Sequence, residues 1–374
     1  MARLNKLFIS CGGTGGHFYP GLSIAREFQS AGGSIRLLLS GKNIASQGDV
    51  AKKYSIPVTS FVTHQLSKSP IKMFSSLFLL SIAFFKFFFL IIKEKPDAVL
   101  AMGSFASIPP VLAAYITRTP VFLHEGNAFV GKANRFLSRF AKLLAISFPA
   151  VNIDSIKCEN IEVGMPIRPE MLGAKLSRSE AIVSFNSKYN MNFNPNEKVI
   201  FVFGGSLGAL VFNKIFPQFY NSESEQFQLV HITGRGNYDT VAESYNTKSE
   251  QENVLVLEYA EDMSLLFSIT DLVISRSGAS TLAELSYYGV PAILVPYPYA
   301  SDDHQKLNAL HFIKRGAAIL IENSDFTIER LSEVFMQLTS DKKYLELMSK
   351  AMLSLSKPKA SSEVLKNIEL FLNK

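Results

Sequence analysis

Three glycine-rich segments contain the residues best suited to hold a phosphate or a sugar. The first, Gly12-Gly13-Thr14-Gly15-Gly16-His17, follows a short apolar run and precedes a stretch with helical spacing. A turn of this kind directs the unpaired backbone N–H groups of a helix start at a ligand, and glycine lets the ligand approach the backbone. The other two segments are Gly204-Gly205-Ser206-Leu207-Gly208-Ala209 and Arg276-Ser277-Gly278-Ala279-Ser280-Thr281. Together they predict a nucleotide diphosphate held mainly by the second half of the chain, with Glu284 one turn into a helix to accept the ribose hydroxyls.

The glycine spacing excludes two common nucleotide sites. Counting Gly-x-Gly-x-x-Gly from Gly13 places Phe18 at the last position, and no Gly-Lys-Ser/Thr sequence completes a P-loop. Neither a nicotinamide enzyme nor an NTPase is therefore expected. Asp302 and Asp303 are adjacent carboxylates on a loop, which seldom converge on one ion without further ligands, and no Cys or His spacing suits zinc. We expect neither a metal nor another cofactor.

Two polar segments offer candidates for proton transfer. His17 stands at the mouth of the first glycine turn, and imidazole titrates near neutral pH, which makes it our candidate general base. His124, Glu125 and Asn127 follow another predicted strand, where open α/β sheets place their binding crevices, and Glu125 is a candidate helper of His17. For each of these residues taken singly, a turn or capping role is equally open.

The glycine turns and the polar segments can form one site only if the strands that precede them end at the same edge of a sheet. Short apolar runs alternate with longer helical stretches, an alternation typical of a parallel sheet. The alternation begins again after Gly164-Met165-Pro166. A chain of 374 residues is long enough for two domains. We therefore predict an α/β fold of two doubly wound parallel sheets, joined by a connection with a surface helix near residues 168–195. The predicted strands are residues 7–10, 35–39, 98–102, 121–124, 143–146, 199–203, 229–232, 254–257, 272–275 and 292–295.

Composition narrows the class of protein. The chain is 47% hydrophobic and 19% charged, which allows sizeable cores and argues against disorder. Two cysteines are too few for a disulfide framework, and a reducing cytosol is expected. The N-terminus leads directly into a glycine turn, so we expect no signal peptide. A net charge of +6 indicates acidic partners, but by itself it does not separate nucleic acid, anionic lipid and phosphorylated substrate.

Residues 74–92 form an unusually apolar segment, with seven phenylalanines and the single charge of Lys86. This length can just cross a bilayer, but Lys86 and the flanking Lys68, Lys72, Lys93 and Lys95 favour contact with an anionic membrane surface. A buried core helix and a membrane span remain open as alternatives.

The ordered motifs resemble the MurG family of glycosyltransferases. The resemblance covers Gly12–His17, the Pro96-Asp97-Ala98-Val99-Leu100-Ala101-Met102-Gly103 run, His124–Asn127, residues 204–209, residues 276–284 and His304-Gln305-Lys306-Leu307-Asn308. It implies a GT-B fold of two Rossmann-like domains facing a cleft. Residues 1–165 would form an acceptor- and membrane-facing domain, to which a helix within residues 350–374 returns, and residues 166–349 would bind the UDP-sugar.

The resemblance also implies an activity. N-acetylglucosamine would pass, with inversion and without metal, from UDP-N-acetylglucosamine to the muramoyl 4-hydroxyl of an undecaprenyl-pyrophosphoryl-muramoyl-pentapeptide, lipid I, giving lipid II. The enzyme would act at the cytoplasmic face of the plasma membrane as a peripheral protein, without nucleic acid. Gly126, Met165 and Leu207 depart from amides common in the family, which makes the sugar contacts less secure than the nucleotide contacts. By residue, the implied UDP-N-acetylglucosamine contacts are Thr14, Gly15, Gly16, Asn127, Arg168, Ser206, Ala260, Ala279, Ser280, Thr281, Leu282, Ala283, Glu284 and Gln305.

Three other functions are compatible with parts of this pattern. A GT-B transferase with another lipid acceptor would share the donor site, although residues 12–17 and 124–127 favour the cell-wall acceptor. A UDP-N-acetylglucosamine epimerase would share the fold but need acidic catalytic residues in the cleft. A membrane-binding scaffold without catalysis is disfavoured by three intact phosphate-type turns.

Overall fold

The computed structural model describes residues 4–63, 70–173, 175–205, 208–223, 227–245, 253–340 and 342–373. The chain divides into two units, unit 1 comprising Met1–Pro169 with Lys357–Lys374, and unit 2 comprising Glu170–Ser356. These bounds differ from the predicted 165 and 350. Residues 166–169 pack with unit 1, whereas α13 (Lys342–Ser354) lies wholly in unit 2.

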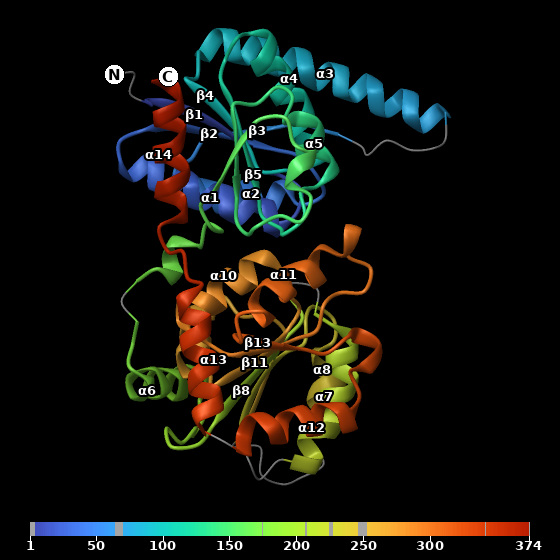
Figure 1. Cartoon of the computed structure of the whole chain (residues 1–374), viewed down its shortest axis with the longest axis vertical. Helices are drawn as coiled ribbons and strands as arrows, with labels where there is room; N and C mark the ends of the chain where they lie inside the picture. Colours follow the sequence, from blue (N-terminus) through green and yellow to red (C-terminus); the bar gives the residue numbers. More distant parts are fainter. Residues whose placement is uncertain are drawn as a thin grey trace. The chain divides into compact units, whose positions relative to one another are not determined.

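Unit 1 is built on a parallel seven-stranded sheet with the order β3-β2-β1-β4-β5-β6-β7. Side chains alternate across it, so that Leu7 and Ile9 face one core and Phe8 faces the other. Helices α1, α2 and α14 cover the first face, and α3 and α4 cover the second (Figure 1). The elements are β1 (Lys6–Ser10), α1 (Gly15–Ser30), β2 (Ser34–Leu39), α2 (Ile44–Lys53), β3 (Val58–Ser60), α3 (Pro70–Glu94), β4 (Ala98–Ala101), α4 (Ile108–Ile116), β5 (Val121–Glu125), α5 (Lys132–Leu137), β6 (Leu143–Ile146), β7 (Glu159–Glu162) and α14 (Ala360–Leu372).

Unit 2 repeats the plan with a parallel six-stranded sheet, in the order β10-β9-β8-β11-β12-β13. One core gathers phenylalanines of α7 and α12 against β8 and β11. The elements are α6 (Arg178–Tyr189), β8 (Val199–Phe203), α7 (Leu210–Glu223), β9 (Gln228–Ile232), α8 (Tyr238–Tyr245), β10 (Val254–Leu257), α9 (Met263–Ile269), β11 (Leu272–Ser275), α10 (Ala279–Tyr288), β12 (Ala292–Leu294), α11 (His304–Ile313), β13 (Ala318–Leu320), α12 (Ile328–Ser340) and α13.

The prediction of two doubly wound parallel sheets is confirmed, and every predicted strand is present. Strands buried on both faces read as continuous apolar runs, which is why the sequence revealed them. Strand β7 was missed because all of its residues are exposed at the sheet edge and two of them are glutamates. Strands β3 and β13 were missed because each is a short strand at a sheet edge and only partly buried, unlike the equally short but fully buried β12.

Helix α3 presents a narrow buried stripe and a wide exposed apolar surface. Ala83, Phe87 and Ile91, spaced one helical turn apart, pack into the core with 0–3% of each residue exposed. By length and composition the segment Met73–Glu94 is long and apolar enough to cross a membrane, but this stripe makes it part of the unit 1 fold. Lys68 lies outside the described residues.

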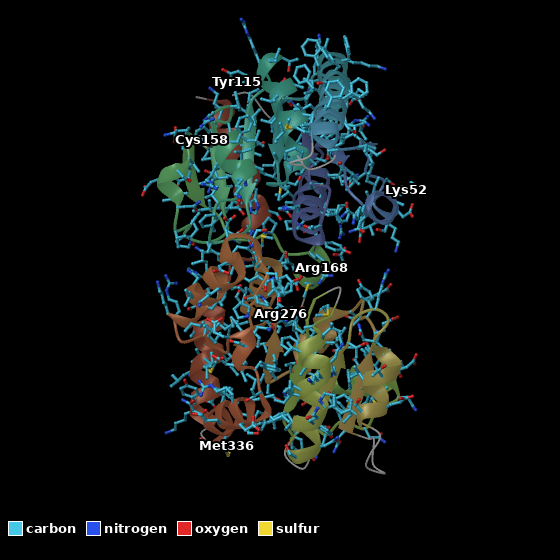
Figure 2. The ribbon with its side chains drawn as sticks, turned by 90° about the vertical axis from the view of Figure 1, so that its right-hand side faces the viewer. Lys52, Tyr115, Cys158, Arg168, Arg276 and Met336 are labelled. Atoms are coloured by element: carbon cyan, nitrogen blue, oxygen red, sulfur yellow. The ribbon has the colours of Figure 1, made fainter. Side chains whose placement is uncertain are left out.

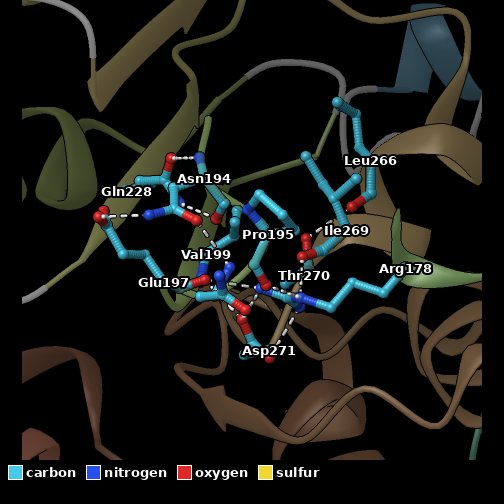
Figure 3. A network of polar contacts seen from close by, with 11 residues as sticks. Arg178, Asn194, Pro195, Glu197, Val199, Gln228, Leu266, Ile269, Thr270 and Asp271 are labelled. Atoms are coloured by element: carbon cyan, nitrogen blue, oxygen red, sulfur yellow. Dashed lines mark hydrogen bonds and ion pairs between the residues drawn. The ribbon is translucent and has the colours of Figure 1, made fainter. Parts of the chain in front are cut away.

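A polar network attaches the connecting helix α6 to the sheet of unit 2 (Figure 3). The Arg178 guanidinium donates to the backbone oxygens of Pro195, Ile269 and Glu197 at 3.2, 2.9 and 2.7 Å, and it pairs with Asp271 at 2.8 Å. Asp271 Oδ2 also accepts the Val199 N–H at 2.7 Å, at the start of β8. Burial raises the pKa of the Asp271 carboxyl, and the Arg178 charge opposes that shift.

Replacing Arg178 by methionine should lower the free energy of unfolding by about 2 kcal/mol, because Asp271 and three backbone oxygens lose their cation in a half-buried site. Urea unfolding followed by far-ultraviolet circular dichroism measures the change. The matched control is Arg330→Met, which removes an exposed pair with Glu333 and should cost under about 0.5 kcal/mol. Equal losses in the two variants would contradict the prediction.

Candidate functional site

The carboxyl edge of the unit 1 sheet holds the first glycine turn. A Cβ on Gly12 would stand 2.2 Å from the Ser40 nitrogen, so the turns after β1 and β2 touch backbone to backbone only because residue 12 is glycine. Gly13 has φ +113°, which other residues rarely adopt. Helix α1 begins at Gly15, and the Thr14 side chain makes no capping bond to it. Thr14, Gly15 and Gly16 are exposed, so the first turn of α1 opens to solvent as an anion site requires.

His17 and His124 lie close enough for the charge on His17 to affect His124. The pKa of His124 is lowered to about 4, above all by burial and in smaller part by the His17 charge, while the hydrogen bond to the Gly164 oxygen opposes this shift. His124 is 1% exposed, and its Nε2 lies 3.5 Å from the Gly164 oxygen and 3.4 Å from Ser147 Oγ. His17 is half-buried. The pair therefore combines a neutral buried imidazole with a more accessible one.

Glu125 is 4% exposed, and its carboxylate accepts hydrogen bonds from four N–H groups. Two donors belong to Asn127, one to the Gly131 backbone and one to Asn134. Sequence reasoning missed Asn134. Its only signal was a polar residue on an otherwise apolar and basic helical stretch soon after the His124–Asn127 motif.

Arg168, labelled in Figure 2, also belongs to unit 1. Its guanidinium stands over the Tyr19 ring, 5.4 Å from the centroid, and a Cβ on Gly15 would lie 3.6 Å from that ring. The structure thus brings Arg168, from a distant part of the sequence, to Tyr19 and the glycine turn that precedes it. A cation beside the N-terminus of α1 strengthens the attraction for an anion.

In unit 2 the glycine turn after β8 packs against the end of β9. A Cβ on Gly208 would stand 2.0 Å from the Thr233 oxygen, and Gly208 has φ +74°. Asn213 on α7 donates to the same oxygen at 3.0 Å and holds the two strand ends together. The predicted contact Ser206 and its neighbour Leu207 lie outside the described residues.

The turn between β11 and α10 brings the remaining predicted contacts of unit 2 together. Ser277 Oγ donates to the Gln305 backbone oxygen at 2.8 Å, and the Tyr297 N–H donates to Gln305 Oε1 at 2.9 Å. Gln305 is thereby fixed beside the start of α10. Arg276, labelled in Figure 2, donates to the oxygens of Val295 and Pro296 and to Asn323, so it braces this turn.

The predicted contact residues on helix α10 differ in which of their atoms can reach a ligand. Ser280 Oγ is buried and has no hydrogen-bond partner among the described residues. Buried hydroxyls are usually hydrogen-bonded, so this one is suited to bond to a ligand. Glu284 is 7% exposed. Leu282 is fully buried in the unit 2 core, so its side chain faces away from any ligand and only its backbone can contribute. Ala260, after β10, is 7% exposed.

Within the described ranges no group of three or more His, Cys, Asp and Glu residues is placed to hold a metal ion. Asp302 and Asp303 instead occupy left-handed backbone conformations, with φ 53° and 50°, directly before α11.

Comparisons with known proteins agree over almost the whole chain. The Glycosyltransferase family 28 N-terminal domain matches residues 7–146, and the C-terminal domain of that family matches residues 199–364. A Desulforamulus reducens protein named UDP-N-acetylglucosamine--N-acetylmuramyl-(pentapeptide) pyrophosphoryl-undecaprenol N-acetylglucosamine transferase is 34% identical over 380 residues, covering 98% of this chain and 99% of the relative. The crystal structure of Acinetobacter baumannii MurG superposes with a TM-score of 0.77 at 26% identity, covering 98% and 99% of the two chains. UDP-GlcNAc 2-epimerase from Neisseria meningitidis, at 14% identity, a TM-score of 0.69 and 97% and 99% coverage, shares the fold alone.

Replacing His124 by glutamine should flatten the acid dependence of stability. The imidazole titrates near 6.5 in the unfolded chain and near 4 in the folded one, so its contribution is complete above pH 6.5 and is lost as the pH falls toward 4. Between pH 7.5 and pH 5.0 the wild-type chain should lose about 2 kcal/mol more than the variant. Urea titrations of both proteins at the two pH values provide the test, and equal losses would contradict it.

Proposed function

The chain belongs to glycosyltransferase family 28 and transfers N-acetylglucosamine from UDP-N-acetylglucosamine to the lipid-linked N-acetylmuramyl-pentapeptide, and we propose which of its residues carry that reaction. The observation that carries the activity is the 34% identity to a named transferase over 98% of this chain. The predicted family, GT-B fold and enzyme class are thereby confirmed.

We propose that unit 2 binds the UDP-sugar. The backbone N–H groups at the starts of α7 and α10, with Ser280 Oγ, would hold the diphosphate, because helix N-termini attract anions. Glu284 would accept two ribose hydroxyls, and Gln305 would bind the sugar through the amide nitrogen that its bond to Tyr297 leaves available. Ala260 would meet the uracil through its backbone.

We propose that unit 1 activates the acceptor hydroxyl. His17 would take the proton of the muramoyl 4-hydroxyl while that oxygen bonds to the sugar C1 and the bond from C1 to the diphosphate breaks, with inversion. Burial keeps the nearby His124 neutral, so His124 adds no second positive charge beside the imidazolium that forms on His17. Thr14, Gly15, Gly16, Asn127 and Arg168 would stabilise the charge that develops on the departing UDP, which requires no metal.

Incubation with UDP-N-acetylglucosamine and a short-chain lipid I analogue in EDTA should release UDP and yield a disaccharide product by mass spectrometry. Glu284→Gln should lower kcat/KM for UDP-N-acetylglucosamine about 100-fold, because a carboxylate that accepts two hydroxyls is lost. The control Glu346→Gln changes an exposed carboxylate on α13 and should leave kcat/KM for UDP-N-acetylglucosamine unaltered.

UDP release without acceptor would favour the epimerase. If the enzyme turns over only with another lipid acceptor, the proposed donor site would stand and the acceptor would have to be reassigned to that lipid. Equal kinetics in the two glutamine variants would contradict the role of Glu284.

We propose that α3 rests on the cytoplasmic face of the plasma membrane as a peripheral contact. Its outer surface exposes large apolar side chains, which form a continuous row along the helix and exceed the scattered apolar residues usual on a soluble surface. Lys86 donates to the Ser60 oxygen at 2.7 Å, which holds its ammonium at the edge strand β3. Among the described side chains of α3, the large apolar ones that are exposed are Met73, Phe74, Leu77, Phe78, Ile82, Phe85, Phe89 and Ile92.

The triple variant Phe74→Ser, Phe78→Ser and Phe85→Ser should bind phosphatidylglycerol vesicles at least 10-fold more weakly than the wild type, because each exposed ring loses its burial in lipid. Vesicle co-sedimentation measures binding, and turnover of a water-soluble acceptor should stay unchanged. The matched control, Val183→Ser, Met336→Ser and Leu347→Ser, removes similarly exposed apolar residues of unit 2. Equal binding by the wild type and the α3 variant would refute the contact.

A further inference from the structure

The carboxylate of Glu125 is saturated by neighbours from its own loop and from α5. Its Oε1 accepts the Asn127 backbone N–H at 3.1 Å and Asn127 Nδ2 at 3.3 Å. Its Oε2 accepts the Gly131 N–H and Asn134 Nδ2, both at 3.0 Å. A general base must present an oxygen to the proton that it takes, and both oxygens here are occupied in a group that is 4% exposed.

Asn134 ties three segments of unit 1 together. It is fully buried on α5, and its Nδ2 donates to the His124 backbone oxygen at 2.9 Å as well as to Glu125. A Cβ on Gly103 would stand 2.9 Å from the same nitrogen, so the end of β4 packs directly against the amide. Both neighbours of Nδ2 are acceptors, which fixes the orientation of the amide, because a flipped amide would set oxygen against oxygen.

The opposite side of this loop has its own clamp. Asn152 Oδ1 accepts the Val130 N–H at 2.8 Å, and Asn152 Nδ2 donates to the Val130 oxygen at 3.1 Å. Residues 125–131 are therefore fixed by Glu125 from within and by Asn152 from the other side. The loop presents Asn127 from the end of β5, on the same sheet edge as the turn that contains His17.

We propose that Glu125 and Asn134 form a positioning pair, which holds residues 125–131 so that Asn127 and the end of β5 keep their place beside His17. Glu125 then acts through Asn127 and does not exchange a proton with the substrate. Asn134 keeps the carboxylate in place by occupying Oε2. The inference rests on the proposed function, because transfer is the reaction by which its effect is measured.

The test compares kcat and its pH dependence in Glu125→Gln, Asn134→Ala and the double variant. Each single change should lower kcat about 100-fold, since a displaced loop misaligns the reacting groups. The double variant should be no slower than the slower single variant, because the two residues act as one unit. The acid limb of the pH profile should keep its midpoint in Glu125→Gln, since another group takes the proton.

Three controls separate positioning from damage. Asn134→Ser keeps a donor for Glu125 and should recover part of the kcat lost in Asn134→Ala, and it serves as the milder variant if the others fold poorly. Asn186→Ala removes a comparable clamp in unit 2, where Asn186 bonds to both backbone groups of Phe193 at 2.9 Å, and should leave kcat unchanged. UDP affinity, measured by calorimetry, should fall far less than kcat in all variants, because the diphosphate is proposed to be held mainly by unit 2.

Loss of the acid limb in Glu125→Gln, or additive effects of the two substitutions, would overturn the inference and return Glu125 to proton transfer. Absence of disaccharide from the wild-type chain would instead contradict the proposed function.

Discussion

Backbone-to-backbone contact at the carboxyl ends of the parallel strands is the constraint on which both candidate sites depend. Gly12 touches Ser40 in unit 1, and Gly208 touches Thr233 in unit 2, at distances that leave no room for a Cβ. This contact lets neighbouring turns close tightly, so that α1 in unit 1 starts at the sheet edge with its N–H groups turned outward. In each unit the helix N-terminus after a glycine turn can therefore attract an anion. The described residues include no metal-binding cluster of three or more His, Cys, Asp or Glu residues.

The polar groups around the unit 1 turn divide into those that are locked and those that are accessible. Burial keeps the His124 imidazole neutral, and four N–H donors hold the Glu125 carboxylate. His17 is half-buried, and Thr14 is exposed. A rigid set of buried groups behind a small accessible set is what preorganised catalysis requires, because the buried hydrogen bonds do not have to rearrange during the reaction.

Helix α3 shows how one segment can serve both the core and a surface. Its buried stripe of Ala83, Phe87 and Ile91 completes the second face of the unit 1 sheet, while Phe74 and Phe89 on the outside are 74% and 65% exposed. An apolar surface of this kind is costly in water. Contact with lipid would offset that cost without removing the helix from the fold.

The fold class follows from local sequence patterns, because strands buried on both faces read as apolar runs and glycine turns mark where each run meets a helix. The sequence also indicated the chemistry, since His17, Glu284 and the ordered family motifs are local patterns. Which polar groups are accessible depends instead on how the elements pack together. The saturation of Glu125, the burial of Leu282 and the roles of Asn134 and Arg178 depend on contacts between separate elements, which no local pattern records. The edge strand β7 and the unit boundary at Pro169 were likewise decided by packing, because neither has an apolar period of its own.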